Sequence, residues 1–221
     1  MIGDISHVYN RGVEKRKIFL DNQDYSRFRD NLFLLNNKKG KIRTKEKDIR
    51  NITDLKQEKL VEVLKWSLLP NHYHLLLYEL VDGGISEFIK RVGNAYTKYF
   101  NTKMQDRSGY LFQNKAQTVL IVEESQFLYI PFYIDLNPLD LKFPNWKSMR
   151  PSKSLASSFL SSYEWSSFRD YFTEGGYQMI LNTKLFSNLF ELPSQKYEKE
   201  LFDFMLEADV STWQVDTVKG I

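Results

Sequence analysis

The stretch Leu69–Leu80, "LPNHYHLLLYEL", places two of the chain's three histidines one residue apart inside an apolar run. The run is typical of a β-strand that begins at His72, and Pro70 belongs in the turn before it, because proline has no N–H to donate to a central ladder. Alternate side chains of a strand share a face, so His72 and His74 are predicted to project together, about 7 Å apart at their Cα atoms.

The segments on either side of this strand predict an alternation of strands and helices. Strands are expected at 5–10, 61–68, 72–80 and 116–122. Helices are expected at about 21–35, 85–100 and 123–137, the first of them capped by Asp21. The order strand, helix, strand, strand, helix, strand, helix predicts an α+β fold, a ferredoxin-like sandwich with an antiparallel sheet covered by helices on one face.

Three segments of different composition divide the chain. Residues 1–140 are predicted to form the main domain, interrupted by a polar and mostly basic insertion at 37–60. Residues 141–175 are rich in Ser, Pro and aromatic residues and are predicted to form an extended wrap. Residues 176–221 are predicted to form a C-terminal helical appendage.

The composition excludes several classes of site. The chain of 221 residues has no cysteine, which excludes disulfides and thiolate metal sites. Its formal net charge of +3 is a mild basic bias that does not identify a partner. The N-terminal residues have no signal-peptide pattern and no apolar run approaches transmembrane length, so the expected compartment is the cytoplasm, without membrane attachment.

Two readings of the histidine pair are open at this point. Buried imidazoles can simply bond to backbone carbonyls, or they can bind a metal ion. A second stretch, "FYIDLNPLD", favours metal binding, because Tyr133 and Asn137 lie four residues apart on the expected helix and so share a face. Asn before Pro is also a common helix end, and a tyrosine can simply pack. Taken together, the two stretches offer two imidazoles, an amide oxygen and a phenol.

These stretches resemble the single-tyrosine HUH transposases (His-hydrophobic-His), in particular the REP-associated tyrosine transposases. The resemblance covers most of residues 5–172 in order, through "HVYNRGVEKRKIFLDNQDYSRF", "LPNHYHLLL", "RSGYLFQNKAQTVLI", "YIDLNP" and "YEWSSFRDY". It implies that His72, His74 and Asn137 hold a divalent metal, Mg²⁺ or Mn²⁺, and that Tyr133 is the nucleophile. The family's DNA-contacting segments correspond to Asn10, Arg11, Arg107, Gln113 and Lys115.

The resemblance implies a metal-dependent endonuclease and strand transferase for single-stranded DNA with hairpin structure, which forms a 5′-phosphotyrosine intermediate. Such a protein would act in the cytoplasm at the nucleoid, as a monomer or a homodimer. One alternative is a domesticated module that binds structured single-stranded DNA without cutting it. Another is a metal hydrolase in which the histidines activate water.

The chain departs from the family pattern at several positions. Tyr73 stands where an aliphatic residue is usual, Asp135 stands where a histidine is common, and the insertion at 37–60 is long. Pro131 would clash with the carbonyl of Phe127 in a regular helix, so we expect a kink or a later helix start there. His7, on the first strand, would neighbour the third strand, either close to the metal or as a core or DNA-facing histidine.

Overall fold

The computed structural model describes residues 1–45, 48–52, 57–105, 107–172 and 176–207. The described residues form a four-stranded sheet in the order β2-β3-β1-β4, in which every neighbouring pair is antiparallel. The strands are β1 (Ile5–Arg11), β2 (Val61–Leu69), β3 (His72–Glu79) and β4 (Gln117–Leu120). The expected α+β fold with a ferredoxin-like strand order is confirmed.

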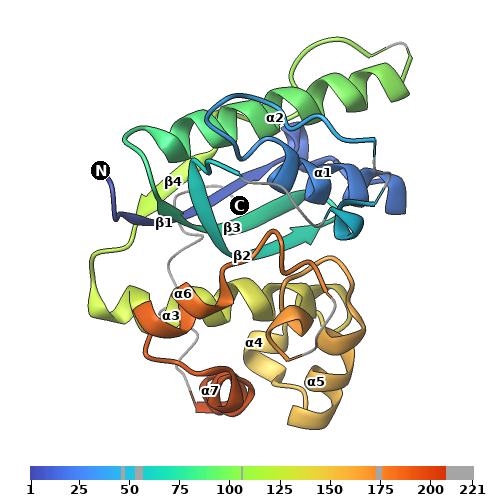
Figure 1. Cartoon of the computed structure of the whole chain (residues 1–221). Helices are drawn as coiled ribbons and strands as arrows, with labels where there is room; N and C mark the ends of the chain where they lie inside the picture. Colours follow the sequence, from blue (N-terminus) through green and yellow to red (C-terminus); the bar gives the residue numbers. More distant parts are fainter. Residues whose placement is uncertain (46–47, 53–56, 106, 173–175, 208–221) are drawn as a thin grey trace.

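Two helices cover one face of the sheet, α1 (Asn22–Leu34) and α2 (Gly84–Lys103) (Figure 1). Asp21 caps α1 as expected, since its carboxylate accepts from the backbone N–H groups of Gln23 and Asp24. The buried stripe of α2 follows helical spacing and comprises Ile85, Phe88, Val92, Tyr96 and Phe100.

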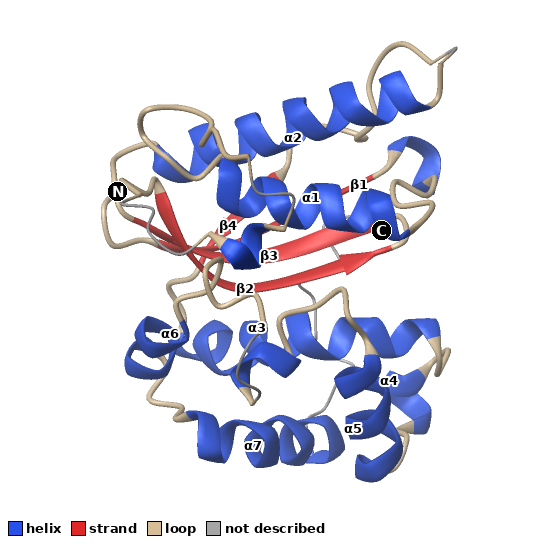
Figure 2. Ribbon diagram, turned by 45° about the vertical axis from the view of Figure 1, so that its right-hand side comes forward, coloured by secondary structure: helices blue, strands red, loops and turns tan. Residues whose placement is uncertain are grey.

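The opposite face is covered as well, which corrects the expectation of helices on one face alone (Figures 1 and 2). It carries α3 (Glu124–Leu136) and the later elements α4 (Trp146–Met149), α5 (Lys153–Ser162), α6 (Thr183–Leu189) and α7 (Ser194–Glu207). All seven residues from Ile130 to Leu136 are buried. A helix segment that is buried all round needs cover on both sides, and the C-terminal elements supply it.

The expected extended conformation of residues 141–175 is wrong, because this segment contains α4 and α5. In α5, Ala156 and Leu160 are buried one turn apart and Ser152 caps the first turn. The serine-rich composition hides this helical spacing in the sequence. Short 3-10 turns complete the chain at η1 (Val13–Lys15), η2 (Ile49–Asn51), η3 (Asn137–Leu141) and η4 (Arg169–Tyr171).

The insertion at 37–60 is attached to the core at several points. Ile42 and Ile49 are buried, and the Asn36 side chain bonds to the backbone of Leu60 and Val61. Residues 46–47 and 53–56 of the insertion, 173–175 of the expected wrap and 208–221 of the expected appendage lie outside the described residues. The division into domain, wrap and appendage stays a prediction.

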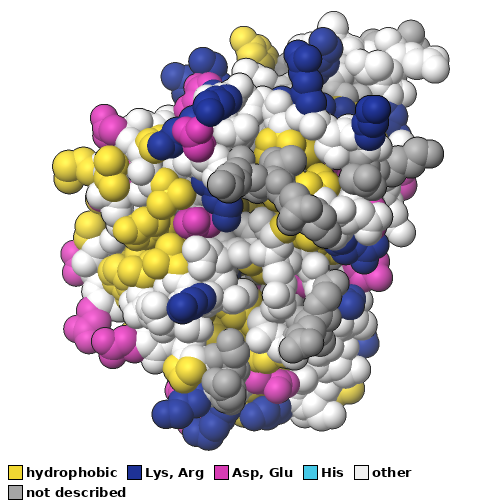
Figure 3. All heavy atoms as spheres, viewed as in Figure 1, with side chains coloured by type: hydrophobic (Ala, Val, Ile, Leu, Met, Phe, Trp, Pro, Cys, Tyr) yellow, Lys and Arg dark blue, Asp and Glu magenta, His cyan; other side chains and the backbone are white. Residues whose placement is uncertain are grey.

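The two edges of the sheet differ. The chain around Ser166 runs along β2, with backbone bonds from Leu68 N–H to Trp165 O and from Ser167 N–H to Trp66 O. At the other edge β4 has exposed neighbours, and Figure 3 shows hydrophobic side chains gathered on that side of the molecule. The exposed apolar residues of this region include Met1, Ile2, Leu120, Val122 and Leu128. Among the described residues, no helix is both long enough and apolar enough to cross a membrane.

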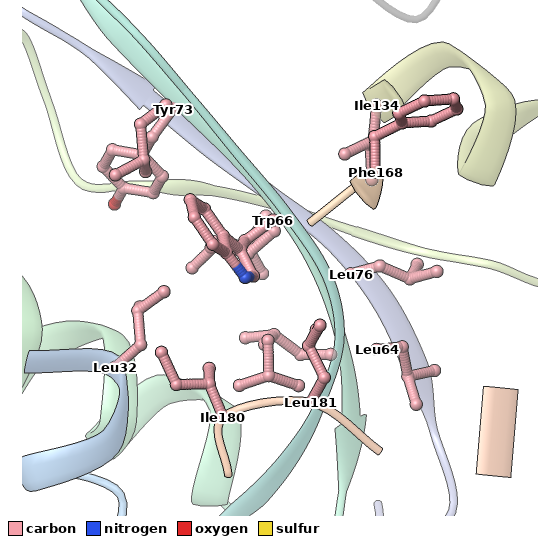
Figure 4. Close-up of a cluster of buried hydrophobic side chains, with 14 of the residues drawn as sticks. Leu32, Leu64, Trp66, Tyr73, Leu76, Ile134, Phe168, Ile180 and Leu181 are labelled. Carbon is pink, nitrogen blue, oxygen red and sulfur yellow. The ribbon is translucent and has the colours of Figure 1, made fainter. Parts of the chain in front are cut away.

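A bulge in β2 decides which side chains face α3. The register shifts between Val63 and Lys65, so that Leu64 is an extra residue and Lys65 pairs with Leu76. Directly opposed residues share a face, which gives three rows on the α3 side: His7–Leu76–Lys65, Tyr9–His74–Ser67 and Arg11–His72–Leu69. Figure 4 shows Trp66 and Tyr73 on one side of the strands and Leu76 and Ile134 on the other.

Candidate active site

The three histidines of the chain lie together on the α3 face of the sheet, and two of them, His7 and His74, contact the ring of Tyr133. The His74 ring lies edge-on to the Tyr133 ring at 5.4 Å between centroids, and the His7 ring lies 6.0 Å from it. His72 and His74 are 5.0 Å apart at their ring centroids. Strand alternation therefore brings the predicted pair together, and the strand order brings His7 to it.

His72 is held between two asparagines. Its Nδ1 lies 2.7 Å from Asn71 Oδ1 and its Nε2 lies 3.3 Å from Asn137 Oδ1. An amide oxygen only accepts and a neutral imidazole carries one proton, so with that proton on Nδ1, the nitrogen of the shorter contact, Nε2 presents a lone pair to a second acceptor. A cation would stabilise that arrangement; without one, the Asn137 amide would have to turn over and donate through Nδ2.

His74 is held by His7. Its Nδ1 lies 3.0 Å from His7 Nε2, and one of these two nitrogens must donate. His74 Nε2 is buried and has no hydrogen-bond partner among the residues that the structure describes. Donation from His74 Nδ1 would leave this Nε2 with a free lone pair, the state that a metal ligand requires.

Burial keeps the imidazoles of this cluster neutral. It lowers the pKa of His7 to about 3 and the pKa of His74 well below its ordinary value. Burial also lowers the pKa of His72 to about 4, against a contrary effect of the Asn137 hydrogen bond and with a small contribution from Arg11. Neutral imidazole is the form that binds metals, so the ring nitrogens are ready for a cation at neutral pH.

The donor atoms of this site suit a divalent metal that takes only a few of its ligands from the protein. Within the described ranges, no group of three or more His, Cys, Asp or Glu side chains is arranged to hold a metal. A metal here would depend on His72, His74 and the amide oxygen of Asn137, with water or phosphate oxygens as further ligands. Two features fit such a metal. His74 Nε2 has no hydrogen-bond partner among the described residues, and His72 Nε2 faces the acceptor Asn137 Oδ1.

Tyr133 lies on α3 one turn before Asn137, and its side chain is 1% exposed. The Tyr129 ring lies 5.5 Å from its ring, and Lys147 Nζ lies 5.4 Å from its ring centroid. Helix α3 continues through Pro131, so the expected later start is wrong. In this conformation a DNA phosphate could reach the hydroxyl only after the groups packed over it move.

The five residues expected to contact DNA occupy different surroundings. Arg11 lies in the same row as His72, and its Nε donates to Gln113 Oε1 at 2.5 Å. Asn10 lies on the opposite face of β1 and donates to the backbone of Asn114. Arg107 bonds to Asn101 and Tyr110 at the end of α2. Lys115 is exposed.

Lys147 is a neighbour of the site that the sequence did not indicate. Its charge contributes to the lowered pKa of His74. It comes from α4, inside the segment expected to be extended, so no helical pattern placed it. The unusual Tyr73 has a simple explanation, since it packs between Phe28 and Phe112 on the α1–α2 face, away from the metal ligands.

Comparisons with known proteins give little beyond this geometry. No protein-family model and no curated protein matches the chain. Among the solved structures that match, one is described as a REP-associated tyrosine transposase bound to a REP hairpin, and it aligns over 81% of this chain and 85% of its own, with 14% sequence identity and a TM-score of 0.49.

Proposed function

We propose that this protein is a metal-dependent endonuclease and strand transferase for single-stranded DNA, with Tyr133 as nucleophile. The observation that carries the proposal is the meeting of His72 and His74 from β3 with Tyr133 of α3 and with Asn137, the residue that caps the end of α3. These are the residues to which the sequence resemblance assigns the metal and the nucleophile. The DNA partner would be a single strand with hairpin structure, which would place the protein at the nucleoid.

The chemistry follows from the residues present. A phenol with a reference pKa near 10 is a weak nucleophile at neutral pH. A bound Mg²⁺ or Mn²⁺ would neutralise charge on the phosphate and orient it. Imidazole and amide donors favour Mn²⁺ by affinity, whereas abundance favours Mg²⁺.

Attack by Tyr133 Oη forms a bond to phosphorus and breaks the bond from phosphorus to the 3′-oxygen. The phenolic proton passes to solvent, and the 3′-oxygen leaves as a hydroxyl. The 5′ side of the DNA stays esterified to the enzyme, and a second 3′-hydroxyl can reverse the step. No nucleotide cofactor is needed, because the phosphotyrosine bond conserves the energy of the phosphodiester.

The surface beside His72 would receive the strand. Arg11 and Gln113 are joined next to the histidine row and would contact a phosphate next to the cleaved one. Lys115 and Arg107 would add electrostatic attraction farther along. Asn10 would act indirectly, by shaping the loop at Asn114.

A binding module that does not cut is the second candidate, and the burial of the Tyr133 side chain favours it. The two functions differ in one product, a covalent protein–DNA adduct. The test is incubation with labelled single-stranded DNA from the sequence flanking its own gene, with Mn²⁺, followed by denaturing electrophoresis and peptide mapping.

We expect an adduct that maps to Tyr133 and is absent in Tyr133→Phe, because this change keeps the ring and deletes the nucleophile. Tyr129→Phe is the matched control, since Tyr129 lies one turn earlier on the same helix. An adduct on another tyrosine would place the active site elsewhere. DNA bound tightly but left uncut would support the binding module.

A further inference from the structure

A buried ion pair lies beside the candidate active site. Lys65 Nζ of β2 is 2.7 Å from Asp135 Oδ2 of α3, and both side chains are fully buried. Asp135 stands two residues after Tyr133 on α3 and two residues before Asn137, the C-cap of that helix. The ion pair thus joins the sheet to the helix turn that carries the proposed nucleophile and metal ligand.

The C-terminal region completes the surroundings of this pair. Tyr197 of α7 donates its hydroxyl to Asp135 Oδ2 at 2.6 Å. Three aromatic rings surround the ammonium of Lys65, with Nζ-to-centroid distances of 3.6 Å for Tyr171, 4.0 Å for Tyr197 and 4.7 Å for Phe186. Tyr171 also donates to the carbonyl of Leu64, the extra residue of the bulge.

The bulge makes the contact possible. If β2 continued regularly from Val63, Leu64 would pair with Leu76 and Lys65 would point to the α1–α2 face, because a shift of one residue moves a side chain to the other face. The irregular strand, the helix and the C-terminal aromatic residues therefore all contribute to one contact.

Stability alone is a poor reason for this arrangement. Replacing a buried ion pair with apolar side chains of similar size is often neutral or stabilising, whereas removing one partner is strongly destabilising. A geometric reason is available. The second half of α3 is buried on every side, so hydrophobic burial alone does not select its rotation about its axis. A polar contact at one position can select it.

We propose that Lys65 and Asp135 are positioning residues that set the rotation of α3 over the sheet, and so hold Tyr133 and Asn137 against the histidines. This inference rests on the proposed function. It assigns a role to Asp135, one of the positions at which the chain departs from the pattern of the family that it resembles.

The test is the triple variant Lys65→Met/Asp135→Leu/Tyr197→Phe, which replaces every polar group of the contact by an apolar one. We expect its melting temperature and its affinity for single-stranded DNA to stay near those of the unmodified protein. The single-turnover rate of adduct formation at saturating DNA and Mn²⁺ should fall about tenfold or more, because small displacements of a nucleophile are costly. Backbone amides of α3 should exchange with solvent faster.

The matched control is Lys199→Met/Asp203→Leu, which removes an exposed ion pair of α7 with an N–O distance of 3.3 Å. This control should change neither the rate of adduct formation nor the hydrogen exchange of α3. Unchanged adduct rate and unchanged α3 exchange in the triple variant would overturn the proposal. If the unmodified protein forms no adduct, the proposed function fails, and hydrogen exchange and Mn²⁺ affinity still decide the positioning role. If the triple variant does not fold, the single variant Tyr197→Phe is measured in its place. An adduct rate and an α3 hydrogen exchange equal to those of the unmodified protein would then overturn the proposal.

Discussion

His72 Nδ1 is bonded to Asn71 and His74 Nδ1 to His7, and the Nε2 atoms of both rings would bind the proposed metal. We therefore expect His72→Ala and His74→Ala to abolish Mn²⁺ binding measured by calorimetry, while circular dichroism shows a folded protein. Ser67→Ala is the control, since Ser67 lies buried in the same row as His74. A variant that unfolds, but binds Mn²⁺ normally in its folded fraction, would identify these histidines as core residues.

The lowered pKa values of the histidines predict a loss of stability in acid when metal is removed by a chelator. The unfolded chain takes up protons near pH 6.5, whereas folded His7 does so only near pH 3. The unfolded state thus binds more protons between these values, and stability falls as pH decreases from 6.5. Each such histidine contributes about 2 kcal/mol of loss between pH 6.5 and 5.

His7→Gln keeps an acceptor for His74 and removes one titrating group. We expect thermal melts from pH 7 to 4.5 to show a shallower loss of stability in this variant. Equal slopes in both proteins would mean that His7 is already protonated in the folded state, contrary to its burial.

For individual residues, the sequence predicted the positions that follow from the regular spacing of a strand or a helix. The two-residue period of a strand placed His72 with His74, and the helical period placed Tyr133 one turn from Asn137. It could not assign the ring nitrogens, because a hydrogen bond such as His7 to His74 depends on two side chains from different strands. Lys147 was missed because its proximity depends on tertiary packing.

The proposed nucleophile Tyr133 lies on α3, and Pro131 divides this helix. The residues from Glu124 to Tyr129 are exposed or partly exposed, whereas Ile130–Leu136 is buried and joined to the sheet by Asp135. Proline removes the N–H that would bond to the Phe127 carbonyl. Pro131→Ala restores that bond and should move the exposed first half of the helix, because the second half is fixed.

We expect Pro131→Ala to leave the single-turnover adduct rate within about threefold of the unmodified protein, well short of the tenfold loss that a displaced nucleophile brings. Denaturing gels at saturating DNA and Mn²⁺ measure it. A loss as large as that expected for the Lys65/Asp135/Tyr197 triple variant would show that Pro131 itself sets the position of Tyr133.

The elements of the sheet could be predicted because each has a clear apolar pattern between turn residues. The bulge at Leu64 could not, since an extra residue inside the continuous run "VEVLKWSLL" leaves no mark in its pattern. The helix α5 was missed for a related reason, because few of its positions are large and apolar.

In the whole molecule, the face of the sheet that carries the candidate active site is covered by chain segments far apart in sequence. Helix α7 lies beside α3, and its side chains Tyr197, Leu201, Phe202 and Met205 are fully buried in the same core. The described part of the predicted appendage therefore contributes directly to the layer that holds Tyr133.

This packing predicts that α7 unfolds together with the sheet. Leu201→Ala removes a fully buried side chain and should cost about 2–5 kcal/mol in one cooperative transition. Leu206→Ala on the same helix is the matched control, since Leu206 is 40% exposed and should cost far less. Urea unfolding followed by tryptophan fluorescence and by far-UV circular dichroism measures both. If Leu201→Ala instead separates the two probes into two transitions, α7 is a docked appendage whose loss the sheet survives, and its contact with Asp135 could be released without unfolding the site.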